Sequence, residues 1–338
     1  MNIELLEKMV EEKFVSVQKH PEADLYIYNY TQKAQYSREW NEVTLQCRGL
    51  IMDSEYNIIQ RPFYKFFNID EHNPKDIPNL PFEVFTKMDG SLGILYWVNN
   101  IPYIATRGSF ESDQAIHATN ILHNKYKNTF GSLDKNKTYL FEIIYPENRI
   151  VVNYGWMDDL VLLAVIDTKS GLDLPLEDIG FPIVKKYNGI KDIEQLREIQ
   201  EENAEGFVIK FSNGFRVKLK FEEYIRLHRI ITNVSNVVIW EYLSQNKPFD
   251  ELVEKVPDEF FNYVKKTAEE LIYKFKVILS ECEEVDKEFE TRKEMAQYFK
   301  QQKYPNILFS MVDEKDYRKE IWKLIRPKYS KPFMEIEE

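Results

Sequence analysis

The distribution of glycine divides the chain into two parts that require different kinds of fold. All eleven glycines of this 338-residue sequence lie at or before Gly214. Up to about residue 232, short apolar runs alternate with turn residues, which is the pattern of strands. Beyond it, Glu, Lys and aromatic residues recur at helical spacing. We therefore expect an α+β domain over residues 1–232 and an all-helical domain over residues 233–338.

The first part contains apolar runs of strand length and two segments with helical spacing. The predicted helices cover residues 112–127 and 192–202. The predicted strands include LYIYNY (25–30), GLIMD (49–53), FEVFTK (82–87), GILYWV (93–98), TYLFEIIY (138–145), LVLLAVID (160–167), GFVIKF (206–211) and FRVKLK (215–220).

Composition excludes several classes of protein. A hydrophobic fraction of 43% predicts a buried core and argues against disorder. The longest aliphatic run, residues 160–166, is too short to span a bilayer, and the N-terminus lacks the layout of a signal peptide. Cys47 and Cys282 make neither a disulfide framework nor a metal knuckle. These features predict a soluble, cytoplasmic protein without membrane partners, located in a host cytoplasm if a phage encodes it.

The net charge of −11 argues against nonspecific coating of nucleic acid but leaves room for local basic surfaces. Residues 213–229 and 315–331 are the two basic segments. A solvated helix face explains the second as well as RNA contact does. Their basic residues are Arg216, Lys218, Lys220, Arg226 and Arg229 in the first, and Lys315, Arg318, Lys319, Lys323, Arg326, Lys328 and Lys331 in the second.

Two motifs place polar residues where apolar strands end or continue. In FTKMDGSLG, residues 85–93, Lys87 ends a strand and a turn follows directly. A solvated strand end beside an ordinary turn would account for it. Glu142 interrupts the apolar run 138–145, and a buried acid is costly unless it is paired or binds a metal. Each residue alone has a purely structural explanation.

The two remaining motifs lie later in the first part. Glu205 directly precedes the strand 206–211, where an exposed acid would be unremarkable. Lys218 and Lys220 are two residues apart on a predicted strand, so both project from one face. A solvated outer face would explain this pair equally well.

The order of these motifs is more specific than any one of them. K-x-D-G-S at 87–91, F-E-I at 141–143, E-G-F-V at 205–208 and K-L-K at 218–220 resemble the ordered motifs of the covalent nucleotidyltransferases, which include polynucleotide ligases and RNA capping enzymes. Over the first 230 residues the chain is similar to the bacteriophage RNA ligase 1 family, the tRNA-repair type. The further matches are YNY (28–30), CRG (47–49), RPFYKFFN (61–68), RGS (107–109) and YPENRIVV (145–152).

The resemblance implies a ligase-type nucleotidyltransferase domain of antiparallel sheets with flanking helices. It also implies an ATP-dependent RNA ligase that joins 5′-phosphate and 3′-hydroxyl ends through lysyl-AMP and adenylylated RNA. The implied cofactors are ATP and Mg²⁺ or Mn²⁺, and the implied partner is RNA, such as nicked tRNA. No glycine begins a GK[ST] phosphate loop, so a separate end-healing kinase or phosphatase is expected.

The resemblance also assigns roles to individual residues. Lys87 matches the nucleophile; a free lysine has a pKa of about 10.4, and nearby cations would disfavour its charged form. Arg107 stands where the family carries a lysine, and the two are not equivalent for binding phosphate. The implied nucleotide contacts are Tyr28, Arg48, Lys65, Glu142, Lys218 and Lys220; the metal ligands are Glu205 and Glu142; the RNA or phosphate contacts are Arg107 and Tyr224.

Three alternatives remain open from the sequence. DNA ligases and capping enzymes usually append a β-rich OB domain after the last motif, where this chain reads as helical. A noncatalytic RNA-binding module would have no need of the full motif set. The helical region could select a structured RNA, by analogy with the family, or could only stabilise the first domain.

Overall fold

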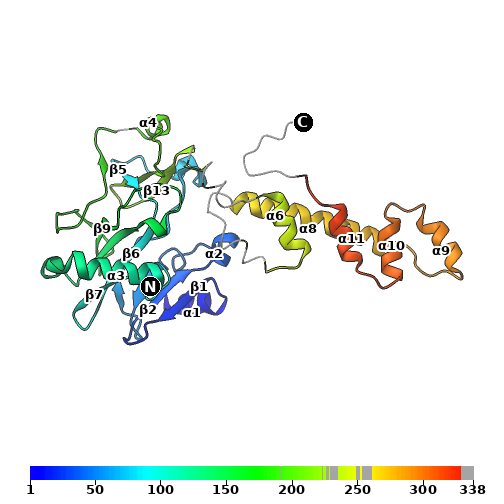
Figure 1. Ribbon diagram of the computed structural model, residues 1–338, viewed down its shortest axis with the longest axis horizontal. Helices are drawn as coiled ribbons and strands as arrows, with labels where there is room; N and C mark the ends of the chain where they lie inside the picture. The colour runs from blue at the N-terminus through cyan, green and yellow to red at the C-terminus, as the bar shows by residue number, and fades with distance from the viewer. Residues whose placement is uncertain are drawn as a thin grey trace. The chain divides into compact units, whose positions relative to one another are not determined.

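The computed structural model describes residues 1–190, 192–222, 224, 225, 228, 235–248, 252 and 261–328. The chain divides into two compact units, Met1–Ile231 and Thr232–Glu338. Figure 1 shows the strands and short helices of the first unit in blue to green and the helices of the second in yellow to red. The α+β architecture followed by helices is confirmed.

Three sheets form the first unit, and neighbouring strands in each are antiparallel. The first is ordered β1-β2-β3-β4, with β1 Val15–Lys19, β2 Tyr26–Tyr30, β3 Arg48–Met52 and β4 Ile58–Gln60. The second is ordered β10-β9-β8-β6-β7, with β6 Ser91–Val98, β7 Ile101–Ala105, β8 Lys137–Ile144, β9 Asp159–Asp167 and β10 Asp173–Leu174. The third is ordered β11-β5-β12-β13, with β5 Phe82–Lys87, β11 Lys186–Tyr187, β12 Gly206–Phe211 and β13 Arg216–Lys220.

Helices flank these sheets in the first unit and make up the described part of the second. The first unit has α1 Ile3–Glu11, α2 Gln32–Ser37, α3 Asp113–Lys125 and α4 Ile193–Glu198. The second has α6 Asn236–Ser244, α8 Phe261–Glu283, α9 Arg292–Phe299, α10 Pro305–Val312 and α11 Tyr317–Leu324. Short 3-10 helices cover Ile69–Glu71, Pro74–Asp76, Lys127–Ser132 and Pro146–Asn148.

Apolar side chains on both faces of the first two sheets hold them together. Leu6 and Met9 of α1 pack under the first sheet. The opposite face of that sheet packs on the second through Ile27 and Ile94, among others. Alternation of side chains along each strand makes this possible, because residues two apart share a face.

The third sheet is placed by two further clusters. Leu196 of α4 packs with Phe207 and Ile209 of β12 under one face. On the other face, Phe85 at the end of β5 packs in a cluster that contains Ile144 at the end of β8. The ends of β5 and β8, each of which carries a predicted site residue, therefore lie at the junction of the second and third sheets.

The second unit has its own apolar core. Residues of α8, α9, α10 and α11 contribute to it, and the indole nitrogen of Trp240 in α6 donates a 2.8 Å hydrogen bond to the backbone oxygen of Trp322. The buried members of the core are Phe275, Ile278, Cys282, Met295, Phe299, Ile307, Leu308 and Ile321. No helix in the described residues is long and apolar enough to cross a membrane.

The sequence interpretation differs from the structure at α4. The structure describes only part of each of the two basic segments. The predicted helix 192–202 ends at Glu198 because Ile199 adopts an extended backbone. In the second basic segment, the guanidinium groups of Arg318 and Arg326 lie over rings of their own unit, 5.5 Å from the centroid of Phe275 and 5.1 Å from that of Trp240. Arg226, Arg229 and Lys331 lie outside the described residues.

Candidate functional site

Register across the third sheet aligns two of the predicted lysines. Lys87, at the end of β5, lies opposite Gly206 of β12, and Gly206 lies opposite Lys220 of β13. Directly opposite residues of antiparallel strands share a face. Two positions along, Val208 lies opposite Lys218, so this lysine belongs to the same face.

Gly206 is the residue that allows this row to form. Its backbone has φ +144, and a Cβ at this position would lie 2.1 Å from the backbone oxygen of Leu219. A side chain would therefore force β12 away from β13. The E-G sequence of the motif places an acid at the strand start and gives the strand the close approach it needs.

Glu205 bridges the two lysines of the row. Its carboxylate accepts a 2.7 Å hydrogen bond from Lys87 Nζ and lies 3.0 Å from Lys220 Nζ. The side chain is only 3% exposed. Burial alone would raise the pKa of Glu205, but the two ammonium groups outweigh it and hold that pKa below its ordinary value. Glu205 is therefore a buried carboxylate that carries its charge.

Glu142 is the second acid of the site and has a different environment. The backbone N–H of Gly90, in the turn after Lys87, donates a 2.9 Å hydrogen bond to its carboxylate. Burial raises the pKa of Glu142 to about 8; Lys87 opposes this rise and Glu205 adds to it. A Cβ on Gly90 would lie 2.6 Å from the backbone oxygen of Ile143, so the turn packs directly on β8.

Asp89 of the same turn connects three segments through hydrogen bonds, a role that the sequence interpretation missed. Its carboxylate accepts hydrogen bonds from the backbone N–H groups of Val151 and Val152, at 2.9 and 2.8 Å. The hydroxyl of Tyr224 donates a third, at 2.8 Å. The backbone N–H of Asp89 donates to the hydroxyl of Tyr154 at 2.8 Å. Asp89 thus joins the lysine turn to the YPENRIVV segment and to Tyr224.

A second group of cations surrounds Tyr30. Arg107 donates a 2.9 Å hydrogen bond to the Tyr30 hydroxyl. The Nζ of buried Lys65 lies 5.2 Å from the centroid of the Tyr30 ring, and the rings of Trp40 and Phe67 lie at similar distances. Such aromatic faces stabilise a cation by their quadrupoles.

Arg48 interacts electrostatically with a member of each group: with Arg107, which contacts Tyr30, and with Glu142, which lies beside the lysine turn. Burial lowers its pKa from the ordinary value. Its Nη1 atom is buried and has no hydrogen-bond partner among the described residues. A buried donor of this kind is costly unless a ligand or water satisfies it, and a phosphate oxygen is a suitable acceptor.

The structure does not place every predicted residue in these groups. Tyr28 packs in the apolar cluster beneath α1 with Leu50 and Cys47, and burial raises its pKa to about 12. Its neighbour Tyr30 makes the contacts with Arg107 and Lys65 instead. The pairing of β2 with β3 shifts register here, because Tyr28 lies opposite Leu50 whereas Asn29 lies opposite Arg48, which leaves Gly49 of β3 as an extra residue.

The last two predicted residues lie beside the lysine row. Lys220 Nζ lies 5.1 Å from the centroid of the Tyr224 ring. The backbone N–H of Lys218 donates a 3.0 Å hydrogen bond to the backbone oxygen of Phe67. This bond joins β13 to the segment that carries Lys65, so the lysine row and the cations around Tyr30 are linked through the backbone.

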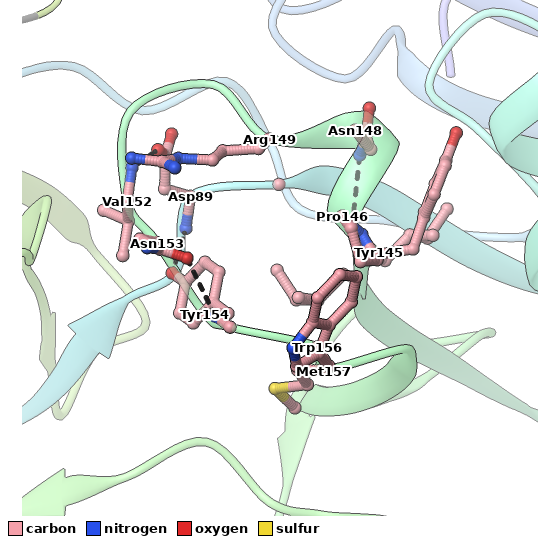
Figure 2. A pocket seen from close by; sticks show the side chains of 14 residues that line it. Asp89, Tyr145, Pro146, Asn148, Arg149, Val152, Asn153, Tyr154, Trp156 and Met157 are labelled. Carbon is pink, nitrogen blue, oxygen red and sulfur yellow. Dashed lines mark hydrogen bonds between the residues drawn. The ribbon is translucent and has the colours of Figure 1, made fainter.

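A pocket of about 350 Å³ opens next to the lysine turn. Asp89 and Gly90 line it on one side, and the segment 143–157 forms the rest of its wall (Figure 2). Trp156, in this segment, is 94% exposed.

The carboxylates of the site limit which metal could bind. Among the described residues, no three His, Cys, Asp or Glu side chains form a metal-binding group. Mg²⁺ commonly takes one or two carboxylates and completes its shell with water and substrate phosphates. Glu142 and Glu205 fit this mode of binding, whereas a complete protein cage or a zinc site is not formed by the described side chains.

Comparisons with known proteins agree with this arrangement of motifs. A family model described as RNA ligase matches residues 46–225, more than half of the chain. A protein of Thermovibrio ammonificans named "Putative RNA ligase" is 29% identical over 242 residues, which are 66% of this chain and 62% of that protein. An RNA ligase of Rhodothermus phage RM378 is 25% identical over 316 residues, covering 70% of each chain.

A third relative differs in length. The "Putative bifunctional polynucleotide kinase/RNA ligase" of Autographa californica nuclear polyhedrosis virus is 26% identical over 281 residues, which are 72% of this chain but 39% of that protein. The chain thus spans 62% and 39% of the lengths of the bacterial and baculoviral relatives. The extent of the family match and the order of the motifs lead to one conclusion: the chain belongs to the RNA ligase family, in the bacteriophage RNA ligase 1 branch.

Proposed function

We propose that the chain is an ATP-dependent RNA ligase that uses Lys87 as its nucleophile. The observation that carries the proposal is the buried bridge from Lys87 through Glu205 to Lys220, at 2.7 and 3.0 Å, on one face of the third sheet. A lysine held at a strand end by a buried acid, next to further cations, suits attack on a polyphosphate.

In the first step, Lys87 Nζ attacks the α-phosphorus of ATP. A bond forms between nitrogen and phosphorus, the bond to the bridging oxygen breaks, and pyrophosphate leaves with the electron pair. The lysine must lose a proton to expose its lone pair, so its ion pair with Glu205 separates and the proton passes to water, which reaches the 21% exposed side chain. Glu205 remains paired with Lys220 when this occurs, which limits the cost of the change.

The surrounding cations would hold the phosphates. Arg48 offers a buried donor without a partner among the described residues, and Lys218 and Lys220 lie on the face that carries Lys87. Negative charge accumulates on the phosphate oxygens and on pyrophosphate as the bond breaks, so fixed cations stabilise the transition state more than the bound substrate. Lys65 and Arg107 extend the positive region around Tyr30.

Glu142 and Glu205 would hold a Mg²⁺ or Mn²⁺ ion together with phosphate oxygens. When bound, the ion would neutralise phosphate charge and position the leaving group. A cation near Glu205 would also compete with the ammonium of Lys87 for the carboxylate, which assists release of the lysine. Glu142 could hold or release a proton near neutral pH because its pKa is about 8.

Two further steps would complete the reaction. An RNA 5′-phosphate takes AMP from Lys87, and an RNA 3′-hydroxyl then attacks the activated end and releases AMP. Nicked tRNA is the substrate that we favour, and residues 233–338 are the candidate for selecting it. A separate kinase or phosphatase would convert other RNA ends to 5′-phosphate and 3′-hydroxyl. The name of the baculoviral relative includes a polynucleotide kinase as well as an RNA ligase.

The experiment that tests the proposal is transfer of label from ATP labelled at the α-phosphate, with a divalent metal. Native protein should carry label on a denaturing gel, and Lys87→Ala should carry none. Lys186→Ala is the matched control, because this exposed lysine also pairs with a glutamate of the third sheet. Labelled protein should then join RNA with 5′-phosphate and 3′-hydroxyl ends in preference to DNA.

Two results would redirect the proposal. Labelling from GTP in place of ATP, or joining of DNA ends, would assign the chain to a capping or DNA ligase function. Absence of label from any nucleotide would support the noncatalytic RNA-binding module.

A further inference from the structure

One tryptophan lies almost wholly in solvent at the pocket beside the lysine turn. Trp156 is 94% exposed, although tryptophan is among the side chains that gain most from burial. Figure 2 shows its indole on the side of the pocket away from Asp89 and Arg149. A large aromatic group kept in water at the mouth of a pocket indicates a binding surface.

The wall next to Trp156 presents a second aromatic ring in a fixed position. Tyr145 lines the pocket, and its ring stacks on that of His117 of α3 with centroids 4.1 Å apart. His117 is itself held, because its Nε2 lies 2.7 Å from a carboxylate oxygen of Asp158. The pocket therefore offers one exposed and one supported aromatic plane.

The opposite wall supplies positive charge. Arg149 lines the pocket, and its guanidinium donates two hydrogen bonds to the backbone oxygen of Val151, at 3.3 and 3.2 Å, which fix its position. The carboxylate of Asp89 already accepts hydrogen bonds from the backbone N–H groups of Val151 and Val152 and from the Tyr224 hydroxyl. An occupant would thus meet aromatic planes and a fixed cation.

We propose that this pocket binds an unpaired nucleobase of the RNA strand that the enzyme joins, with the base on Trp156 and an adjacent phosphate near Arg149. The inference rests on the proposed function. Aromatic planes with basic side chains recognise single-stranded RNA through stacking and phosphate contact. Asp89 and Gly90 line both the pocket and the turn after Lys87, so a base bound here lies beside the reacting end.

The adenine of ATP is a different candidate for the same pocket. Lys87, Glu205 and Lys220 do not belong to the pocket wall, which instead comprises the turn residues and the segment 143–157. ATP must place its α-phosphate at Lys87, and the cations proposed to hold its phosphates, Arg48 and Lys218, are likewise absent from the pocket wall. RNA is therefore the occupant that the geometry favours.

The test uses the full chain and a 5′-phosphorylated single-stranded RNA of about ten nucleotides, without ATP. Binding is followed by anisotropy of a dye on the RNA. Trp156→Ala should weaken RNA binding about tenfold, equal to about 1.4 kcal/mol. Trp156→Phe, which keeps an aromatic plane, should recover most of this loss. Leu172→Ala is the matched control, because it removes another largely solvated apolar side chain, 68% exposed, from the same unit.

Affinity for ATP is measured with the same variants through labelling of Lys87. A loss of ATP affinity with RNA affinity unchanged would assign the pocket to adenine and overturn the proposal. RNA affinity in Trp156→Ala equal to that in Leu172→Ala would also overturn it. Because RNA binding is read without ATP, a protein that binds RNA through Trp156 but takes no label refutes the proposed ligase activity and still shows that this pocket binds RNA.

Discussion

Two glutamates of the third sheet each pair with two lysines, but one is buried and the other is exposed to solvent. Glu205 bridges Lys87 and Lys220 at one end of β5, and Glu83, near the other end, bridges Lys186 and Lys210. Both carboxyl groups have a pKa below the ordinary value: lysine hydrogen bonds are the main cause for Glu83, whereas for Glu205 the lysines overcome a large opposing effect of burial. The side chain of Glu83 is 39% exposed, against 3% for Glu205.

The difference teaches that the same three charges form an exposed ion-pair network around Glu83 and a buried one around Glu205, where we propose the reactive lysine. Water screens the charges around Glu83, so that bridge contributes little to stability. At Glu205 each charge depends on the others, because the site offers little water to replace a lost partner. Such dependence lets a substrate or metal ion redistribute the partners of Lys87.

Removing the charge of Glu205 should have the largest effect. Glu205→Gln leaves the ammonium groups of Lys87 and Lys220 close together without their carboxylate. We expect the free energy of unfolding at pH 7 to fall by about 3 kcal/mol. Urea denaturation followed by tryptophan emission measures this loss as a lower midpoint.

Glu83→Gln is the matched control for that measurement, since it removes a glutamate with two lysine partners from the same sheet. Solvent screening limits its expected cost to below about 1 kcal/mol. Equal losses in the two variants would mean that burial does not distinguish the bridges, and the comparison would fail.

Glu142 extends the comparison to a third glutamate, whose carboxylate accepts a hydrogen bond from the backbone N–H of Gly90 where Glu205 and Glu83 accept from lysines. Its folded-state pKa of about 8 lies above the ordinary value of 4.5. The folded state therefore binds more protons between these values, and the associated stability is present below pH 4.5 and lost as pH rises toward 8. Glu142→Gln should remove a slope of up to about 1.4 kcal/mol per pH unit.

Unfolding free energies between pH 5 and pH 8 measure this slope in the native chain and the variant. Glu205→Gln provides the opposite sign in a second series below pH 4.5, since its lowered pKa gives stability that is present above pH 4.5 and lost on acidification. If Glu142→Gln kept the native dependence on pH, the carboxyl group would be charged in the folded state and would not hold a proton near neutral pH.

A smaller effect is expected at Asp89, where neutral donors replace the lysines. Tyr224→Phe removes the hydroxyl that donates to the Asp89 carboxylate, while the N–H groups of Val151 and Val152 remain. We expect a loss of about 1.5 kcal/mol in unfolding free energy. Tyr273→Phe, at a ring that is 69% exposed, should cost almost nothing. If Tyr224→Phe lowered the unfolding free energy no more than Tyr273→Phe, the hydrogen bond from the Tyr224 hydroxyl to Asp89 would contribute nothing to stability.

Much of this site could be predicted because strand periodicity is local. Two-residue alternation places Lys218 and Lys220 on one face, and the register of the third sheet adds Lys87 to it. The choice between Tyr28 and Tyr30 could not be predicted, because the contacts that distinguish them are tertiary: Tyr28 packs in the cluster beneath α1, and Tyr30 contacts Arg107. The exposure of Trp156 was equally hidden, since an aromatic residue in a sequence gives no sign of whether a core will cover it.

The sequence by itself determined the two-part organisation, the strands of the first unit and the order of the motifs, because these depend on local periodicity and on where glycine permits turns. Only the tertiary structure decided that Glu205 is charged and bridges two lysines while Glu142 has a raised pKa. Lys87 and Glu205 are 118 residues apart in the chain. Their pairing depends on the register of three strands and on the exclusion of water around them, and neither property belongs to any single stretch of sequence.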